Sequence, residues 1–169
     1  MHPFFQRNRV RAALGALALA VVVTAGGPAT STLAAGSPDF MTLLQAASWN
    51  SNKAQPFKFA AVYKRKTADN GPAKTTIYLQ KGFGTPTITN AGGFSCTKAY
   101  QPSGWFPGWH ITCTKPSITP NGAWFEAIEI QTTAPTTAGD FLVISGIDPT
   151  GGADAFPDDN RDTQKLHVN

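Results

Sequence analysis

The sequence predicts an all-β fold, either a sandwich or a barrel. After residue 36, glycine and proline interrupt the chain roughly every 8–12 residues, a spacing typical of β-sandwiches and β-barrels. The runs between these turn residues are short and rich in valine, isoleucine, threonine, phenylalanine and tyrosine, which favour strands. Only residues 39–49 carry an apolar spacing that also suits a helix.

Alternating side chains place the strands along the chain. Residues 140–147 carry the strongest pattern, with every second side chain from Phe141 onward on one face. Pro86 lacks a backbone N–H, so we expect its strand at the edge of a sheet. The predicted strands are residues 57–63, 75–79, 85–89, 94–99, 110–114, 123–131, 140–147 and 163–168.

Residues 39–49 fit two patterns. As a helix, the segment places Phe40, Leu43, Leu44 and Ala47 on one stripe. As a strand, it places Phe40, Thr42 and Leu44 on one face. A run this short does not decide between the two patterns by itself.

The first 35 residues have the layout of a secretory signal peptide. Three arginines precede an uncharged apolar run at residues 12–23, and small residues follow up to residues 34–36. The run is shorter than the roughly 20 residues that span a bilayer. We therefore expect residues 1–35 to be removed and residues 36–169 to form one exported domain, without a membrane span, that is secreted or associated with the cell surface.

The net charge of +4 comes largely from this leader. Residues 1–35 hold three arginines and no acid, so the remaining chain has a net charge of +1. Nucleic-acid binding needs a basic face on the folded domain, and we expect none. Residues 40–115 hold nine basic residues and one acid, whereas residues 116–169 hold two basic residues and eight acids. In a sandwich these two halves interleave, so we expect them to neutralise each other.

Cys96 and Cys113 are the two cysteines of the chain. Exported proteins meet an oxidising environment, so we expect a disulfide between them. Closing a loop of this length stabilises a fold by about 3 kcal/mol in the chain-entropy model.

The residues suggest no catalytic or cofactor site. His110 and His167 are the histidines beyond the leader, and no Gly-x-Ser-x-Gly motif is present. Glu126 and Glu129 are three apart on a predicted strand and so face opposite sides of the sheet. We therefore expect a protein that is not an enzyme and needs no cofactor.

An acidic loop at residues 148–160 is rich in the oxygen ligands that calcium prefers. The EF-hand pattern fails there, because the sixth position from Asp158 is Thr163 and the twelfth is Asn169. Asp and Asn are also ordinary turn residues. We predict no metal site.

The segment at residues 104–109 holds three large rings inside the expected disulfide loop. Exposed aromatic rings commonly carry binding energy, so the segment is a candidate binding surface. Large rings also pack inward, and these could instead cap the core with Trp49 or Trp124. The candidate surface consists of Tyr100, Trp105, Phe106 and Trp109.

Six different short motifs follow one another along the chain. They are Asn70-Gly71-Pro72-Ala73, Phe94-Ser95-Cys96-Thr97, Ile111-Thr112-Cys113-Thr114, Pro120-Asn121-Gly122-Ala123, Ala134-Pro135-Thr136-Thr137-Ala138-Gly139 and Asp158-Asp159-Asn160. In this order they resemble the bacterial immunoglobulin-like conserved-repeat family (domain of unknown function eleven). The resemblance implies an immunoglobulin-like antiparallel β-sandwich of about seven or eight strands, with a first strand at residues 39–45. It implies no chemistry.

These expectations together indicate a secreted or surface-associated, non-catalytic structural or interaction module. We expect it to be a monomer that binds another envelope or extracellular protein. The alternative is a small carbohydrate-binding protein that uses the aromatic loop from Trp105 to Trp109.

Overall fold

The computed structural model describes residues 39–65, 72–116, 126–149 and 160–169. These residues belong to the unit formed by residues 32–169. They form ten strands, and the described part of the chain contains no helix. The predicted all-β class is therefore confirmed, while the predicted signal peptide lies outside the described residues.

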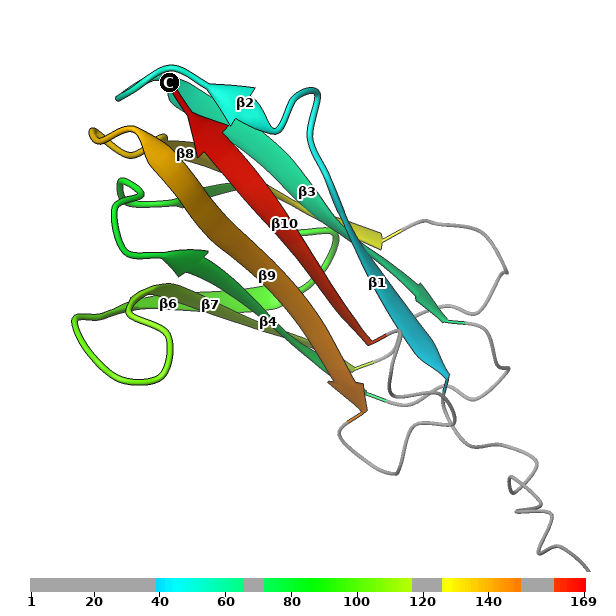
Figure 1. Ribbon diagram of the computed structural model, residues 1–169. Helices are drawn as coiled ribbons and strands as arrows, with labels where there is room; N and C mark the ends of the chain where they lie inside the picture. Colours follow the sequence, from blue (N-terminus) through cyan, green and yellow to red (C-terminus); the bar gives the residue numbers. More distant parts are fainter. Residues whose placement is uncertain (1–38, 66–71, 117–125, 150–159) are drawn as a thin grey trace, which may run out of the picture. The chain divides into compact units, whose positions relative to one another are not determined.

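The strands form two sheets that pack as a sandwich (Figure 1). One sheet has the order β1 (Phe40–Gln45), β3 (Pro56–Arg65), β8 (Glu126–Thr133) and β5 (Thr87–Asn90). The other has the order β2 (Asn50–Ser51), β10 (Arg161–Val168), β9 (Gly139–Pro149), β4 (Ala73–Gln80), β7 (Gly108–Lys115) and β6 (Ser95–Gln101). Neighbouring strands run antiparallel except β2 and β10, which pair in parallel.

The ambiguous segment at residues 39–49 is a strand in its first half. Phe40, Thr42 and Leu44 are buried, as the alternating pattern predicted, and β1 pairs with β3. A helix there would satisfy its own backbone but would leave the edge of β3 without a partner. The edge position of Pro86 is also confirmed, because β5 is the last strand of its sheet.

The described residues form ten strands, where the family resemblance implied about seven or eight. The strand β2 has only two residues, and so short an element leaves no periodic signal. The predicted strand at residues 123–131 begins at Glu126 in the described part of the chain.

Four buried hydroxyl groups, those of Thr42, Tyr63, Thr75 and Ser145, join the two sheets through the core. The Ser145 hydroxyl contacts the Thr42 hydroxyl at 2.9 Å and the Tyr63 hydroxyl at 3.1 Å. Thr75 bonds the Tyr63 hydroxyl and donates to the carbonyl of Gly146 at 2.8 Å. Burial raises the pKa of Tyr63 to about 12, against the opposing effect of these hydrogen bonds.

Candidate docking surface

The aromatic segment forms the tip of the hairpin between β6 and β7. The two strands pair from Ser95 to Gln101, so residues 102–107 are the connecting loop. Cys96 and Cys113 lie directly opposite each other in this register and form the predicted disulfide. The hairpin is thus bonded covalently as well as through its backbone.

Gly108 allows the hairpin to close against β4. Its φ is +142°, and a Cβ at this position would collide with the carbonyl oxygen of Leu79. Next to it, the Lys81 N–H donates to the Pro107 carbonyl at 2.7 Å. A side chain at position 108 would push the loop away from β4.

Trp105 and Phe106 lie over the outer face of the six-stranded sheet. Both rings contact the ring of Tyr78, with centroid distances of 5.1 and 5.7 Å. Tyr78 points outward, because its neighbour Leu79 is fully buried in the core. The His110 ring lies against Tyr78 with a centroid distance of 4.8 Å, and its Nε2 donates to the Phe106 carbonyl at 2.8 Å.

These contacts hold the loop but leave one ring in solvent. Phe106 is 8% exposed, whereas Trp105 is 69% exposed. Trp105 therefore has most of its surface available for a partner, and Phe106 serves as its support.

Tyr100 and Trp109 lie on the other face of the same sheet. They are register partners, and their ring centroids are 5.2 Å apart. Trp109 is also the register partner of Leu79, so it shares the inner face and packs on the core. Both rings line a hollow of about 610 Å³ beside residues 81–85.

The four predicted aromatic residues therefore do not form one surface, because the sheet separates them into two pairs. The four rings differ in their exposure. Trp105 and Tyr100 are exposed, whereas Phe106 is buried and Trp109 packs on the core. The Trp49 ring packs against Phe57, with ring centroids 5.6 Å apart, rather than against the hairpin loop. Trp124 lies outside the described residues.

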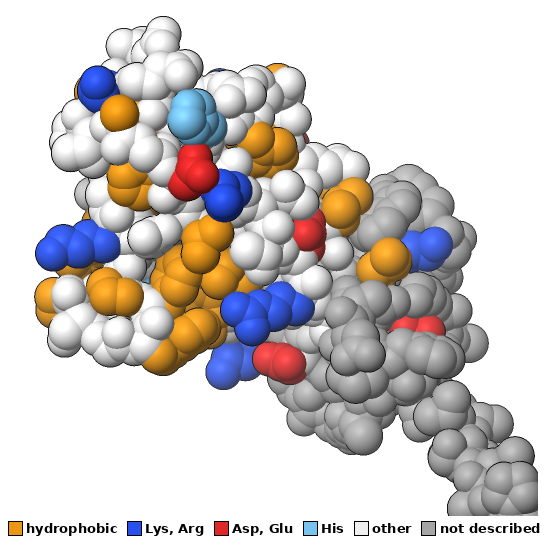
Figure 2. All heavy atoms as spheres, viewed as in Figure 1, with side chains coloured by type: hydrophobic (Ala, Val, Ile, Leu, Met, Phe, Trp, Pro, Cys, Tyr) orange, Lys and Arg blue, Asp and Glu red, His pale blue; other side chains and the backbone are white. Residues whose placement is uncertain are grey.

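The outer face carries further apolar side chains that the sequence analysis missed. Tyr78 pairs in register with Ile144 on β9, and Leu142 lies two residues along on the same face. Figure 2 shows hydrophobic side chains gathered over β9 and β4. The available signal was the alternation within residues 140–147, which places Leu142 and Ile144 opposite the core-facing set.

An exposed ionic cluster borders this apolar area (Figure 2). His167 Nδ1 lies 2.8 Å from the Asp140 carboxylate, and Lys165 Nζ lies 3.3 Å from it. The hydrogen bond from His167, followed by that from Lys165, lowers the pKa of Asp140. In the described part of the chain, no serine, threonine or cysteine side chain hydrogen-bonds to the His167 ring.

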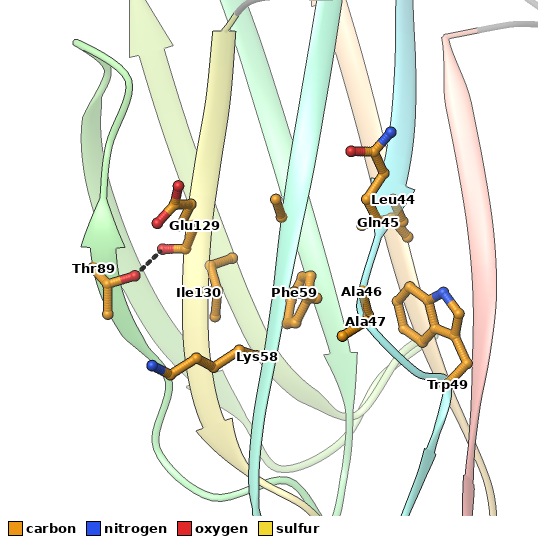
Figure 3. Close-up of a pocket in the computed structure, with 11 residues that line it drawn as sticks. Leu44, Gln45, Ala46, Ala47, Trp49, Lys58, Phe59, Thr89, Glu129 and Ile130 are labelled. Atoms are coloured by element: carbon orange, nitrogen blue, oxygen red, sulfur yellow. Dashed lines mark hydrogen bonds between the residues drawn. The ribbon is translucent and has the colours of Figure 1, made fainter.

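The four-stranded sheet has a separate hollow of about 810 Å³ (Figure 3). Lys58, Thr89 and Glu129 lie on one side of it, and the segment with Ala47 and Trp49 lies on the other. Its polar side chains are exposed and differ in charge. This hollow lies on the opposite sheet from the hairpin.

The acidic loop falls largely on residues 150–159, outside the described part of the chain. Within that part, no three His, Cys, Asp or Glu side chains gather as a metal site would require. The described segments also contain no helix with the length and apolar character of a membrane span.

No protein-family model matches the sequence, and no curated protein matches it. Solved structures do match. The chain is similar to the CARDB domain of a Pyrococcus furiosus protein, solved in complex with di-metal ions, with a TM-score of 0.51 and 12% identity over 78% of this chain and 94% of that chain.

Two further solved structures are similar to the chain. A Clostridium perfringens cohesin module, from a family 33 glycoside hydrolase, has a TM-score of 0.46 and 10% identity over 79% of this chain and 98% of that chain. The human F-spondin reeler domain has a TM-score of 0.41 and 14% identity over 79% of this chain and 91% of that chain. The CARDB match and the two packed sheets show an immunoglobulin-like β-sandwich.

Proposed function

We propose that this protein is an exported, non-catalytic module that binds another extracellular protein through the outer face of its six-stranded sheet. The observation that carries the proposal is the exposure of Trp105, which is 69% exposed at a hairpin tip. Tryptophan is among the residue types that most often dominate the energy of protein interfaces. The partly exposed neighbours Tyr78 and Leu142 extend the contact area around it.

The loop that carries Trp105 is fixed before binding. Lys81 and His110 each donate a hydrogen bond to a carbonyl of the loop, and Phe106 is buried beneath it. An anchor held in this way loses little conformational entropy when a partner binds. A preformed aromatic anchor supports docking on a folded protein surface.

Two further features support export and the absence of catalysis. The leader-like residues 1–35 and the Cys96–Cys113 disulfide both suit an oxidising compartment. The His110 ring is occupied by aromatic contacts and by the Phe106 carbonyl. We also propose, on the order of its motifs, that the chain is a divergent single copy of the conserved-repeat family.

Carbohydrate binding is a second candidate, because an exposed indole face can also stack on a sugar ring. Trp105 and Trp109 lie on opposite faces of the sheet, so they do not form one two-ring platform. A sugar would therefore have to bind through Trp105 and its neighbour Tyr78.

The test is cross-linked capture from the extracellular fraction of the source organism, using the folded protein, Trp105→Ala and the control Gln101→Ala. Gln101 is also exposed and lies near the same hairpin tip. We expect a captured protein to be lost with Trp105→Ala, kept with Gln101→Ala and unaffected by soluble polysaccharide. Equal capture by Trp105→Ala would refute the proposal, and loss of capture with polysaccharide would favour the glycan candidate.

A further inference from the structure

Three of the four sheet edges are protected against another strand. On β1, the Leu44 N–H is already bonded at 2.7 Å to the carboxylate of Asp162 from β10. The strand β5 has four residues, follows Pro86 and contains a register shift. The strand β2 has only two residues. Occupied donors, short strands, proline and bulges are the usual ways to protect an edge.

The edge of β6 has none of these protections. It is seven residues long, its register is regular throughout, and among the described strands it pairs with β7 alone. Its one charged side chain, Lys98, bends back to donate to the Pro86 carbonyl at 2.6 Å. A lysine that extends from an edge strand would deter pairing, but this one is held against its own molecule.

The register shows which backbone groups of β6 are free. The Cα atoms of Cys96 and Cys113 are 4.0 Å apart, which is the close spacing of a pair that exchanges no backbone hydrogen bonds. The N–H and C=O of Cys96 therefore point away from β7. Because the pattern repeats every second residue, those of Lys98 and Tyr100 point the same way. These three residues offer a ladder to one added strand.

A hollow beside this edge suits a side chain of the added strand. Tyr100 and Trp109 line it together with the buried Phe83 and with Gly82 and Gly84. Tyr100 is on the inner face of β6, so a residue paired opposite it would also point inward and into the hollow. The ring surfaces favour an aromatic or aliphatic side chain there.

The hollow beside the edge is basic. The exposed Lys81 lines it, and β6, β7 and residues 81–85 contain no acid. An acidic residue in the added segment would therefore be attracted to this edge.

We propose that β6 accepts an extended segment of another protein as an additional antiparallel strand. The segment carries an apolar side chain that enters the hollow between Tyr100, Trp109 and residues 81–85, and an acidic residue that meets Lys81. Backbone hydrogen bonds supply affinity in this mode of recognition, and the pocket supplies specificity. The site is distinct from the Trp105 surface and does not depend on it.

The probe is a blocked seven-residue peptide that alternates threonine and valine, with a central phenylalanine and one glutamate. We expect its titration to slow amide hydrogen exchange at Lys98 and Tyr100, as measured by NMR. Trp105→Ala should bind the peptide as the unaltered protein does. Absence of binding, or protection confined to the loop around Trp105, would overturn the proposal.

Lys98→Pro tests the backbone contact directly, with Lys98→Ala as its matched control. Both remove the lysine, but only proline removes the N–H that points away from β7, so the β6–β7 ladder keeps its bonds. Losing one backbone hydrogen bond should weaken peptide binding about five- to tenfold relative to Lys98→Ala. Equal affinities would overturn the proposal. Where Lys98→Pro does not fold, a peptide N-methylated on the groups that face β6 replaces it and should bind correspondingly less well.

Discussion

At the scale of single residues, the buried hydroxyl groups specify how the two sheets pack more narrowly than the apolar side chains of the core do. Tyr63 is buried from end to end, yet its hydroxyl is satisfied by Ser145 and Thr75 from the opposite sheet. Burying a polar group without a partner is costly, so the Tyr63 hydroxyl depends on these two residues. Because they come from β3, β4 and β9, the network also fixes how the two sheets pack.

Tyr63→Phe should therefore destabilise the protein by about 1–3 kcal/mol at neutral pH, because it leaves the Ser145 and Thr75 hydroxyls without their shared partner. Urea unfolding checks this cost. Ile130→Val, a substitution in the same core that removes no polar group, should cost less, about 0.5–1.5 kcal/mol. A cost near zero for Tyr63→Phe would show that the network adds nothing to stability.

The same residue predicts a pH dependence. The pKa of Tyr63 is about 12 in the folded protein and 10.0 as its ordinary value, so the unfolded chain loses its proton first. Its contribution is complete below pH 10 and is lost as the pH rises towards 12. The loss should be about 1.4 kcal/mol at pH 11 and approach about 2–3 kcal/mol above pH 12, and Tyr63→Phe should lack this loss. Parallel unfolding curves at pH 9 and 11 for both proteins make the comparison, and identical losses would contradict the assignment.

At the scale of elements, the edge strands of the sandwich differ in whether their outward backbone groups are protected. The carboxylate of Asp162 on β10 accepts the Leu44 N–H, so a side chain of one sheet completes the edge strand of the other. The strand β6 is held on one side by β7 and the disulfide, and its other side is open. Protection of one edge and exposure of another is the pattern expected where one edge has a binding role.

Asp162→Ala should cost about 1–3 kcal/mol of stability, because it leaves the Leu44 N–H without its acceptor. Amide exchange at Leu44 should accelerate more than exchange in the central strand β9. Thr163→Ala, at an exposed neighbouring position, is the control and should change stability by less than about 0.5 kcal/mol. Unchanged exchange at Leu44 would show that this hydrogen bond does not hold β1.

At the scale of the whole molecule, the two oppositely charged halves of the sequence interleave as expected. Acid-rich strands lie beside basic ones, since β8 pairs with β3 and β9 with β4. Lys115 on β7 bonds Glu126 on β8 at 2.8 Å, which links the two sheets. The strands β6 and β7 themselves contain no Asp or Glu.

The disulfide acts on the whole molecule through the unfolded chain. Replacing Cys96 and Cys113 together with alanine should lower the free energy of unfolding by about 3 kcal/mol, because the unfolded chain gains freedom. Reducing the unaltered protein should give a similar loss, measured by urea unfolding with and without a thiol reductant. A stability that is independent of the bond would show that the hairpin is already fixed by its backbone ladder.

The sequence predicted the all-β class, most of the strands, the disulfide and the edge position of Pro86. These features follow from local rules, since alternation, proline and compartment act over a few residues. It also placed four aromatic residues together in one candidate surface, and it missed Tyr78 and Ile144. That grouping assumed that all four rings belong to one loop surface. Tyr100 and Trp109 lie on strands instead, where alternate side chains point to opposite faces of the sheet.

The sequence by itself determined that this chain buries alternate side chains between sheets and closes one loop with two cysteines. Only the tertiary structure decided that Trp105 faces solvent while Trp109 packs on the core, and that β6 is the open edge. The reason is physical: which face a side chain occupies depends on register with a distant strand, and whether an edge is covered depends on residues such as Asp162 that lie far away in the chain.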